Sequence, residues 1–483
     1  MKNLTRKTLI LTLAALFCFA AVSLAQKSPK DKFVFGPLNP IKLPQIEKVE
    51  LANGLTLYLV EDHDYPTIDM RAMVRTGSVY EPADKIGLAA VCGQALRTGG
   101  TQTKTGDEID KELETLAATV ETGIGQTSGY IMISVLKEDV DHALAILADI
   151  LMNPAFREEK IELAKIQQRT TISRRNDNIM PIAFREFTKL VYGKDSPYAR
   201  STEYSTIAAI TRQDLVDFYK AYFYPNNTIM AVWGDFDSKA MAGKIKQTLG
   251  QWKPGKVVIP PLPKVDYAYK YTVNFISKPD VNQSNILIGH IGGLMDNPDY
   301  PALSVMNSIL SFDRMFKKIR TDEGLAYAVW GDYEANYRHP GIFSSGAQTK
   351  SESTVYAIEL MLKEMKRITE QEVTDQELSK AKDTYLNSYV FNFDSRAQIV
   401  NRLMTYAYFG YPLDFMEKVK AGVEKVTKAD VLRVAKEYLK PDKVQILVVG
   451  KEADFDKPLK TFGEVNVIDI TIPPPPQPPP QKK

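Results

Sequence analysis

The stretch ITRQDLVDFYKAYFYPNNTIMAVWGDFD (residues 210–237) recurs in related form later in the chain. It aligns without a gap on VTKADVLRVAKEYLKPDKVQILVVGKEA (residues 426–453), at a constant offset of 216 residues. Identical residues at matching positions include Thr211/Thr427, Asp214/Asp430, Tyr222/Tyr438, Pro225/Pro441 and Gly234/Gly450. Each copy predicts a capped helix, a turn marked by the proline, and a buried strand that ends in glycine. A match of this length indicates an internal duplication.

The sequence around these copies predicts an α+β fold. Apolar and polar residues alternate over residues 43–78, and Asn53-Gly54 marks a hairpin turn. Strands also fit residues 127–136 and 226–235, whereas EDVDHALAILADILMN (138–153) has the apolar spacing of an amphipathic helix. We therefore expect two duplicated α/β halves, each a mainly antiparallel sheet covered by helices on one side. Joined by a Pro-rich linker, the halves would face each other across a cleft in a clam-like arrangement.

The first 25 residues have the layout of a secretory signal peptide. The basic start MKNLTRK precedes the short apolar run TLILTLAALFCFAAV and the small-residue cleavage site Ser23-Leu24-Ala25. We therefore expect an exported protein, located in the periplasm or outside the cell. We predict a signal peptide (1–25), an N-terminal domain (26–251), a Pro-rich linker (252–265), a C-terminal domain (266–455) and a tail (456–483) that is proline-rich from residue 473.

Charge and cysteine content narrow the possible partners and the compartment. The formal net charge of +2 falls to about −1 when the three basic residues of the signal peptide are removed, which argues against a nucleic-acid partner. Cys92 is then the only cysteine, so an intrachain disulfide is impossible. After removal of the signal peptide, no apolar run approaches the ~20 residues of a membrane-spanning helix.

The residues available for a metal or nucleophilic site are few. The histidines are His63, His142, His290 and His339, and no two of them have metal-ligand spacing. Asp62, His63 and Asp64 also lie together, and we interpret them as a polar hairpin tip rather than a metal site. Glu158, Glu159 and Glu162 fit the solvated first turns of a helix. Cys92 has no histidine nearby in sequence and fits a small core thiol.

The stretch GLAAVCGQALRTGG (87–100) decides the functional interpretation. Together with Asn53-Gly54-Leu55, Gly77-Ser78 and Glu81, it resembles the frame around the zinc motif H-x-x-E-H of the insulinase-like (pitrilysin) metallopeptidase family. The family's zinc-binding and catalytic positions correspond here to Ala90, Gly93, Gln94 and either Thr170 or Thr171. None of these residue types is a good zinc ligand or general base. The resemblance therefore implies a chain that holds no metal and is inactive alone.

A second signature of the same family is kept. FDRMFKKIRTDEGLAYAVWGDYE (312–334) resembles the family pattern R-L-x-x-x-I-R-E-x-x-G-L-A-Y-x-V. In that family an arginine and a tyrosine seven residues apart reach toward the bound peptide, and the matching pair is Arg320 and Tyr327. Gly324 is expected to end the helix that carries Arg320, so both side chains would meet at a helix–strand junction and donate hydrogen bonds to a peptide carbonyl or its oxyanion. The alternative is structural, with Arg320 at a helix C-terminus and Tyr327 in the core.

The resemblance covers about residues 45 to 455 and implies a non-catalytic, substrate-holding subunit of an exported heterodimeric zinc metallopeptidase. A homologous partner subunit would supply the zinc, and the pair would degrade or process peptides. In the family such peptides add as a strand to a sheet edge, for which the counterpart here is residues 118–134. One alternative is a stand-alone peptide-binding or scaffolding protein without an enzymatic partner. Another is a peptidase with relocated metal ligands.

Overall fold

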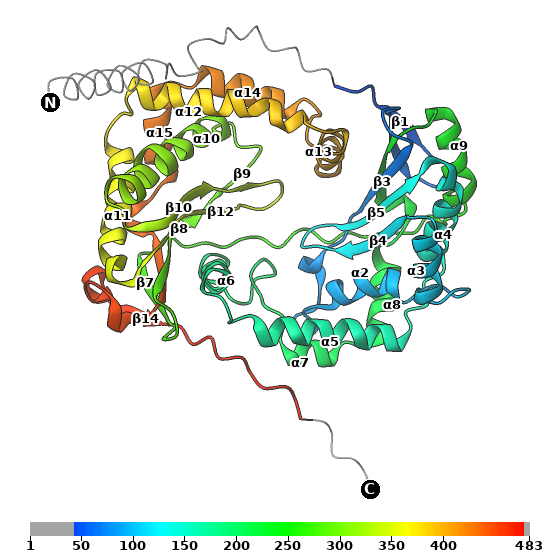
Figure 1. Cartoon of the computed structure of the whole chain (residues 1–483), viewed down its shortest axis with the longest axis horizontal. Helices are drawn as coiled ribbons and strands as arrows, with labels where there is room; N and C mark the ends of the chain where they lie inside the picture. Colours follow the sequence, from blue (N-terminus) through cyan, green and yellow to red (C-terminus); the bar gives the residue numbers. More distant parts are fainter. Residues whose placement is uncertain (1–42, 478–483) are drawn as a thin grey trace, which may run out of the picture. The chain divides into compact units, whose positions relative to one another are not determined.

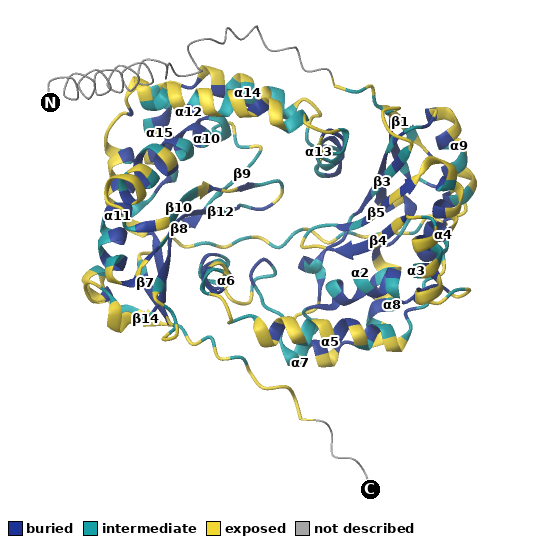
Figure 2. Cartoon of the chain, in the orientation of Figure 1, coloured by how far each residue is buried: buried dark blue, intermediate teal, exposed yellow. Residues whose placement is uncertain are grey.

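The computed structural model describes residues 43–477. The predicted signal peptide and the last residues of the proline-rich tail lie outside the described residues. Within the described part, no helix has the length and apolar character that crossing a membrane would require. The strands of both sheets are mostly buried, whereas the outward faces of helices such as α9 and α11 are exposed (Figure 2).

The first half is built on a six-stranded sheet, of which Figure 1 labels β1, β3, β5 and β4. The strand order is β1-β2-β6-β3-β5-β4. Its strands are β1 (Glu47–Glu50), β2 (Thr56–Glu61), β3 (Thr67–Val74), β4 (Thr119–Ile124), β5 (Gly129–Leu136) and β6 (Thr228–Gly234). Neighbours are antiparallel except β2 and β6, which are parallel. The predicted hairpin turn joins β1 to β2, where Gly54 has a φ of 87° that favours glycine.

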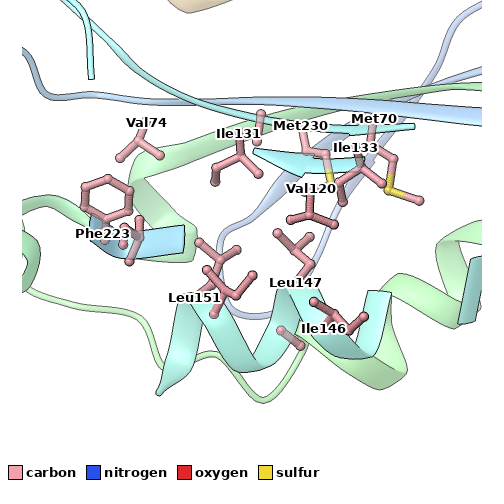
Figure 3. Close-up of a cluster of buried hydrophobic side chains, with 14 of the residues drawn as sticks. Met70, Val74, Val120, Ile131, Ile133, Ile146, Leu147, Leu151, Phe223 and Met230 are labelled. Atoms are coloured by element: carbon pink, nitrogen blue, oxygen red, sulfur yellow. The ribbon is translucent and has the colours of Figure 1, made fainter. Parts of the chain in front are cut away.

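Helices cover one face of this sheet. They are α2 (Leu88–Thr98), α3 (Gly106–Thr115), α4 (Val140–Met152), α5 (Glu158–Arg174), α7 (Tyr204–Ala209), α8 (Arg212–Tyr222) and α9 (Ser238–Leu249). Figure 3 shows Leu147 and Leu151 of α4 facing Val120, Ile131 and Ile133 of the sheet. All five side chains are buried, and each such burial contributes roughly 1.5–3 kcal/mol before conformational entropy is subtracted.

The second half repeats this plan with the order β10-β12-β8-β13-β7-β14. Its strands are β7 (Thr272–Ser277), β8 (Gln283–Ile291), β10 (Ala326–Tyr333), β12 (Ile342–Lys350), β13 (Gln445–Gly450) and β14 (Val465–Val467), and β9 (Gly293–Leu294) pairs separately with β11 (Ala335–Asn336). Its helices are α10 (Tyr300–Ser308), the π-helix η5 (Ile309–Asp322), α11 (Thr354–Glu370), α12 (Asp375–Ser388), α13 (Arg396–Phe409), α14 (Phe415–Lys425) and α15 (Lys428–Tyr438).

The structure confirms two related halves, each with a mainly antiparallel sheet. Strands β7 and β8 and helix α15 begin 216 residues after β2, β3 and α8. The two sheet orders also coincide when one of them is reversed, so β13 takes the place of β6. In both copies of the repeat a threonine and an aspartate close a capping box, Thr211 with Asp214 and Thr427 with Asp430. The repeated residues therefore start the same helix in each half.

Two sequence predictions need correction. Residues 62–64 are not a hairpin tip, because β6 lies between β2 and β3 and the connection crosses the end of β6. There His63 Nδ1 lies 2.6 Å from Asp235 Oδ1. The tail also begins later than residue 456, since Leu459 is fully buried and β14 extends the second sheet parallel to β7. Between the halves, residues 253–271 contain no helix or strand, whereas Trp252 is buried in the first core.

The second face of each sheet receives a helix from the other half, which the prediction of one-sided covering missed. Helix α6 (Ile179–Tyr192) belongs to the first half but packs on β8 and β13. Its buried residues there are Ile182, Ala183, Phe187 and Val191, in contact with Ile276, Leu287, Ile291, Leu447 and Val449. Helix α13 packs on β6 in the same way, through Val400, Met404 and Tyr408. The halves therefore share parts of their cores.

Candidate functional site

Helix α2 carries the positions that correspond to the zinc motif, and a buried carboxylate sets its start. Glu81 accepts hydrogen bonds from the backbone N–H groups of Gly87 (2.9 Å) and Ala89 (2.7 Å). A carboxylate in this place satisfies otherwise unpaired N–H groups and complements the helix dipole. Burial raises the pKa of Glu81 even though these two N–H groups favour its charged form. Glu81 is therefore a capping residue of this helix.

The two positions that would hold imidazoles share one face of α2. Ala90 and Gln94 are both partly exposed, and the Gln94 side chain donates from Nε2 to Oε1 of Gln167 on α5 at 2.5 Å. Thr170 and Thr171 instead donate their hydroxyls to carbonyls of their own helix. The residue that meets Gln94 is thus Gln167, one turn before the predicted threonines. Residues three apart in a helix lie on the same face, so Gln167 could have been predicted as a neighbour of Gln94 from the position of Thr170.

Gly93 leaves no space for the glutamate that the motif has at this position. A Cβ atom on Gly93 would lie 2.5 Å from the backbone nitrogen of Ile124 in β4. The Gly93 carbonyl also accepts a hydrogen bond from Thr122 Oγ1 at 2.6 Å. Helix and strand are therefore in direct contact where a catalytic side chain would stand.

The side chains at these positions do not suit zinc. An alanine, a glycine and two hydrogen-bonded glutamines offer neither imidazole nor carboxylate, which are the groups that hold a catalytic zinc ion. Among residues 43–477, no three histidine, cysteine, aspartate or glutamate side chains are grouped so that they could hold a metal ion. No chemical step can be assigned to a metal on this helix.

The structure brings Arg320 and Tyr327 together. Arg320 lies in the last turn of η5, Gly324 follows with a φ of 65°, and Tyr327 is the second residue of β10. The guanidinium carbon of Arg320 is 5.6 Å from the centre of the Tyr327 ring and 5.1 Å from that of Phe316. These are cation–π distances, which hold the guanidinium over two rings.

Both side chains of this pair face solvent. Tyr327 is 76% exposed, so the alternative of a core tyrosine is wrong. Within the described residues, the Arg320 guanidinium makes no ion pair and no side-chain hydrogen bond. Its N–H groups and the Tyr327 hydroxyl are free to donate to an external acceptor such as a carbonyl oxygen. A catalytic role for the pair stays a prediction.

Two family models match the chain. Insulinase (Peptidase family M16) matches residues 57–202, and Peptidase M16 inactive domain matches residues 209–385. The chain belongs to the insulinase (M16) peptidase family. The first match spans β2 through α6, with the altered helix α2, and the second includes Arg320 and Tyr327.

Relatives of this M16 chain have varied descriptions. An uncharacterized zinc protease of Rickettsia felis is 27% identical over 348 residues, which cover 69% of this chain and 80% of the relative. The non-peptidase homolog YmxG of Helicobacter pylori is 23% identical over 399 residues, covering 81% and 91%.

Solved structures share the fold. The peptidase M16 inactive domain from Pseudomonas fluorescens superposes with a TM-score of 0.77 at 23% identity, covering 86% of this chain and 99% of that one. The first half of the periplasmic protease PqqL from Escherichia coli has a TM-score of 0.72 at 16% identity, covering 85% and 94%. These likenesses establish the M16 fold.

Strand β4 forms the sheet edge beside α2 in this M16 chain, and its Val120 carbonyl accepts a hydrogen bond from Arg97 Nε at 2.9 Å. Strand β4 is the last strand of the first sheet and pairs only with β5. Of the predicted segment 118–134, only β4 lies at the edge, because β5 is paired on both sides. Unpaired backbone groups of an edge strand are able to bind an extended peptide.

The remaining candidate residues are dispersed through the M16 fold. His290 and His339 are both buried, and burial lowers the pKa of each to about 4. Burial also raises the pKa of the Cys92 thiol. A raised pKa disfavours the thiolate, which is the nucleophilic form of cysteine. Glu158 starts α5 as predicted, and Glu162 pairs with Lys165 at 2.9 Å on the same helix.

Proposed function

We propose that this chain is the non-catalytic, substrate-holding subunit of an exported heterodimeric zinc metallopeptidase. The observation that carries the proposal is a contrast between the two halves. Helix α2 lacks every metal-binding side chain of the M16 motif, whereas Arg320 and Tyr327 stand together, exposed, with free donors. Hydrogen-bond donors in a chain without a metal site can still bind the substrate carbonyl if a partner subunit holds the metal.

In this proposal the chain acts on substrate through hydrogen bonds alone. The guanidinium of Arg320 and the hydroxyl of Tyr327 donate to the oxygen of the scissile carbonyl, on which negative charge grows during hydrolysis. Donors fixed in place before the reaction favour the transition state over the ground state. The homologous partner subunit supplies the zinc ion and the general base.

The first half contributes binding in the same proposal. An extended peptide pairs with the free edge of β4 through main-chain hydrogen bonds, which orient the peptide without reading its sequence. Export follows from the signal-peptide pattern of residues 1–25. A relative in fold that is described as a periplasmic protease is compatible with that location.

The test is reconstitution with an M16 homologue that contains H-x-x-E-H. Alone, this chain should cleave no peptide, and cleavage of a fluorogenic peptide library should rise when both proteins are mixed. Arg320→Gln and Tyr327→Phe should each lower kcat of the mixture by about 100- to 1,000-fold, the range measured for lost oxyanion donors. Assembly, measured by size-exclusion chromatography with light scattering, should be unchanged.

Lys317→Gln is the matched control, because Lys317 is exposed on the same helix and outside the pair. It should retain the activity of the unmodified mixture. Full activity of both Arg320→Gln and Tyr327→Phe would remove these residues from the mechanism. Failure of every such homologue to associate would favour the stand-alone peptide-binding protein.

A further inference from the structure

A small cavity lies where the two halves and the linker meet. Its volume is about 220 Å³. The first half contributes Arg75, Thr76 and Tyr80, the linker contributes residues 259–262, and the second half contributes Arg338 and Tyr408. The cavity lining includes neither the zinc-motif positions of α2 nor Arg320 and Tyr327.

The charged groups that line this cavity are all positive. They are the guanidinium groups of Arg75 and Arg338, and no aspartate or glutamate lines it. Among the described residues, neither guanidinium forms an ion pair. Arg75 is positioned by the Tyr408 ring, whose centre lies 5.5 Å from its guanidinium carbon. The Tyr408 hydroxyl is itself anchored to the carbonyls of Val74 and Thr127, at 3.2 and 2.8 Å.

A buried hydroxyl in the cavity wall has no partner. Thr76 is 1% exposed, and its Oγ1 makes no hydrogen bond in the structure. A buried polar group without a partner costs about 1–3 kcal/mol, so such groups are rare in folded proteins. Thr76, Arg75 and Arg338 thus bring one hydroxyl and two guanidinium groups to the wall of the same cavity.

We infer that this cavity binds a compact oxyanion, namely a carboxylate or a phosphate. The planar guanidinium groups match two oxygens of either ion, and Thr76 adds a neutral donor. Two sources have this chemistry: the C-terminal carboxylate of a peptide, and free inorganic phosphate. Because Arg75 and Arg338 come from different halves, the bound ion joins them. The site requires only this chain and does not depend on the proposed function.

Isothermal titration calorimetry of the whole chain at low ionic strength, where screening is weak, tests this inference. The ligands are inorganic phosphate, N-acetyl-trialanine with a free carboxylate, and the same peptide as its C-terminal amide. We expect one oxyanion per chain. Arg338→Gln should weaken binding by about 10- to 100-fold, because a hydrogen bond to a charged group is lost. Arg338 is exposed, so the variant should fold.

Two further variants complete the design. Thr76→Val keeps the shape of the side chain and should weaken binding several-fold, whereas Arg174→Gln, at an exposed arginine of α5, should bind like the unmodified chain. Tighter binding of the free peptide than of its amide would assign the site to chain ends, and binding of phosphate alone would assign it to the free ion. The inference is overturned if the unmodified chain binds none of these ligands, or if Arg338→Gln and Thr76→Val bind as it does.

Discussion

At the residue scale, Gly93 determines what α2 is able to carry. The backbone of β4 approaches so closely that an added Cβ would lie 2.5 Å from Ile124 N, and backbone is unable to move aside as a flexible side chain would. The backbone of β4 therefore occupies the space that a side chain at residue 93 would need. Restoring the motif's residue types would require β4 to shift.

We predict that Gly93→Glu lowers the free energy of unfolding by about 1–3 kcal/mol or more, because overpacking forces the backbone apart. Urea denaturation followed by circular dichroism measures this loss. Ala90→Ser, at a partly exposed position one turn earlier, is the control and should change stability by less than about 1 kcal/mol. If Gly93→Glu and the unmodified chain had equal free energies of unfolding, β4 would be able to shift without loss of stability.

At the element scale, His290 connects β8 to the end of α15. Its Nδ1 lies 2.7 Å from the carbonyl of Ile291, and its Nε2 accepts from the N–H of Lys440 at 3.3 Å. These bonds require the neutral ring, with the proton on Nδ1. Burial lowers the pKa of His290 to about 4, from an ordinary value of 6.5. The unfolded chain therefore binds a proton at this residue that the folded chain does not bind between these two pH values.

Stability from His290 should thus be present above pH 6.5 and should be lost as the pH falls toward 4. We predict that the free energy of unfolding drops by about 2 kcal/mol from this residue between pH 7.5 and pH 5. Urea titrations at both pH values should show a smaller drop for His290→Gln, although His339 still contributes its own share. His142→Gln, at an exposed histidine, should retain the full drop. An unchanged drop in His290→Gln would refute this account.

At the scale of the whole molecule, α6 and α13 are exchanged between the halves. Each helix buries its apolar side against a sheet that the other half builds. Phe187 of α6 is 2% exposed and lies in the cluster that includes Leu287 of β8 and Leu447 of β13. A substitution in the part of α6 that packs on β8 and β13 should therefore destabilise the second sheet.

We predict that Phe187→Ala costs about 3–5 kcal/mol and raises hydrogen exchange along β8 and β13, although the substituted residue belongs to the other half. Mass spectrometry of peptic peptides from these strands provides the measurement. Phe184→Ala lies on the same helix at a residue that is 42% exposed, and it should have a smaller effect. If amide hydrogen exchange increased only in the first half, the inference that the two halves share parts of their cores would be wrong.

Features encoded in short stretches of residues could be predicted without the structure. The capping boxes of Thr211 and Thr427 and the strands with alternating polarity depend on neighbours within a few residues, and the duplication follows from comparing two such segments. The residue types at Ala90 and Gln94 are also read directly from the sequence. The expected end of the helix at Gly324 also placed Arg320 near Tyr327, because only a short turn separates them.

Which distant segments meet becomes visible only in the folded chain. There β6 lies between β2 and β3, and α6 and α13 each pack on the sheet of the other half. Gln167 contacts Gln94, and Arg75 and Arg338 line one cavity. An apolar pattern predicts that one face of a helix or strand will be buried. It does not predict which element will bury that face, because the hydrophobic effect is non-directional. The choice among partners depends on packing between residues far apart in the chain, and that packing exists only in the folded molecule.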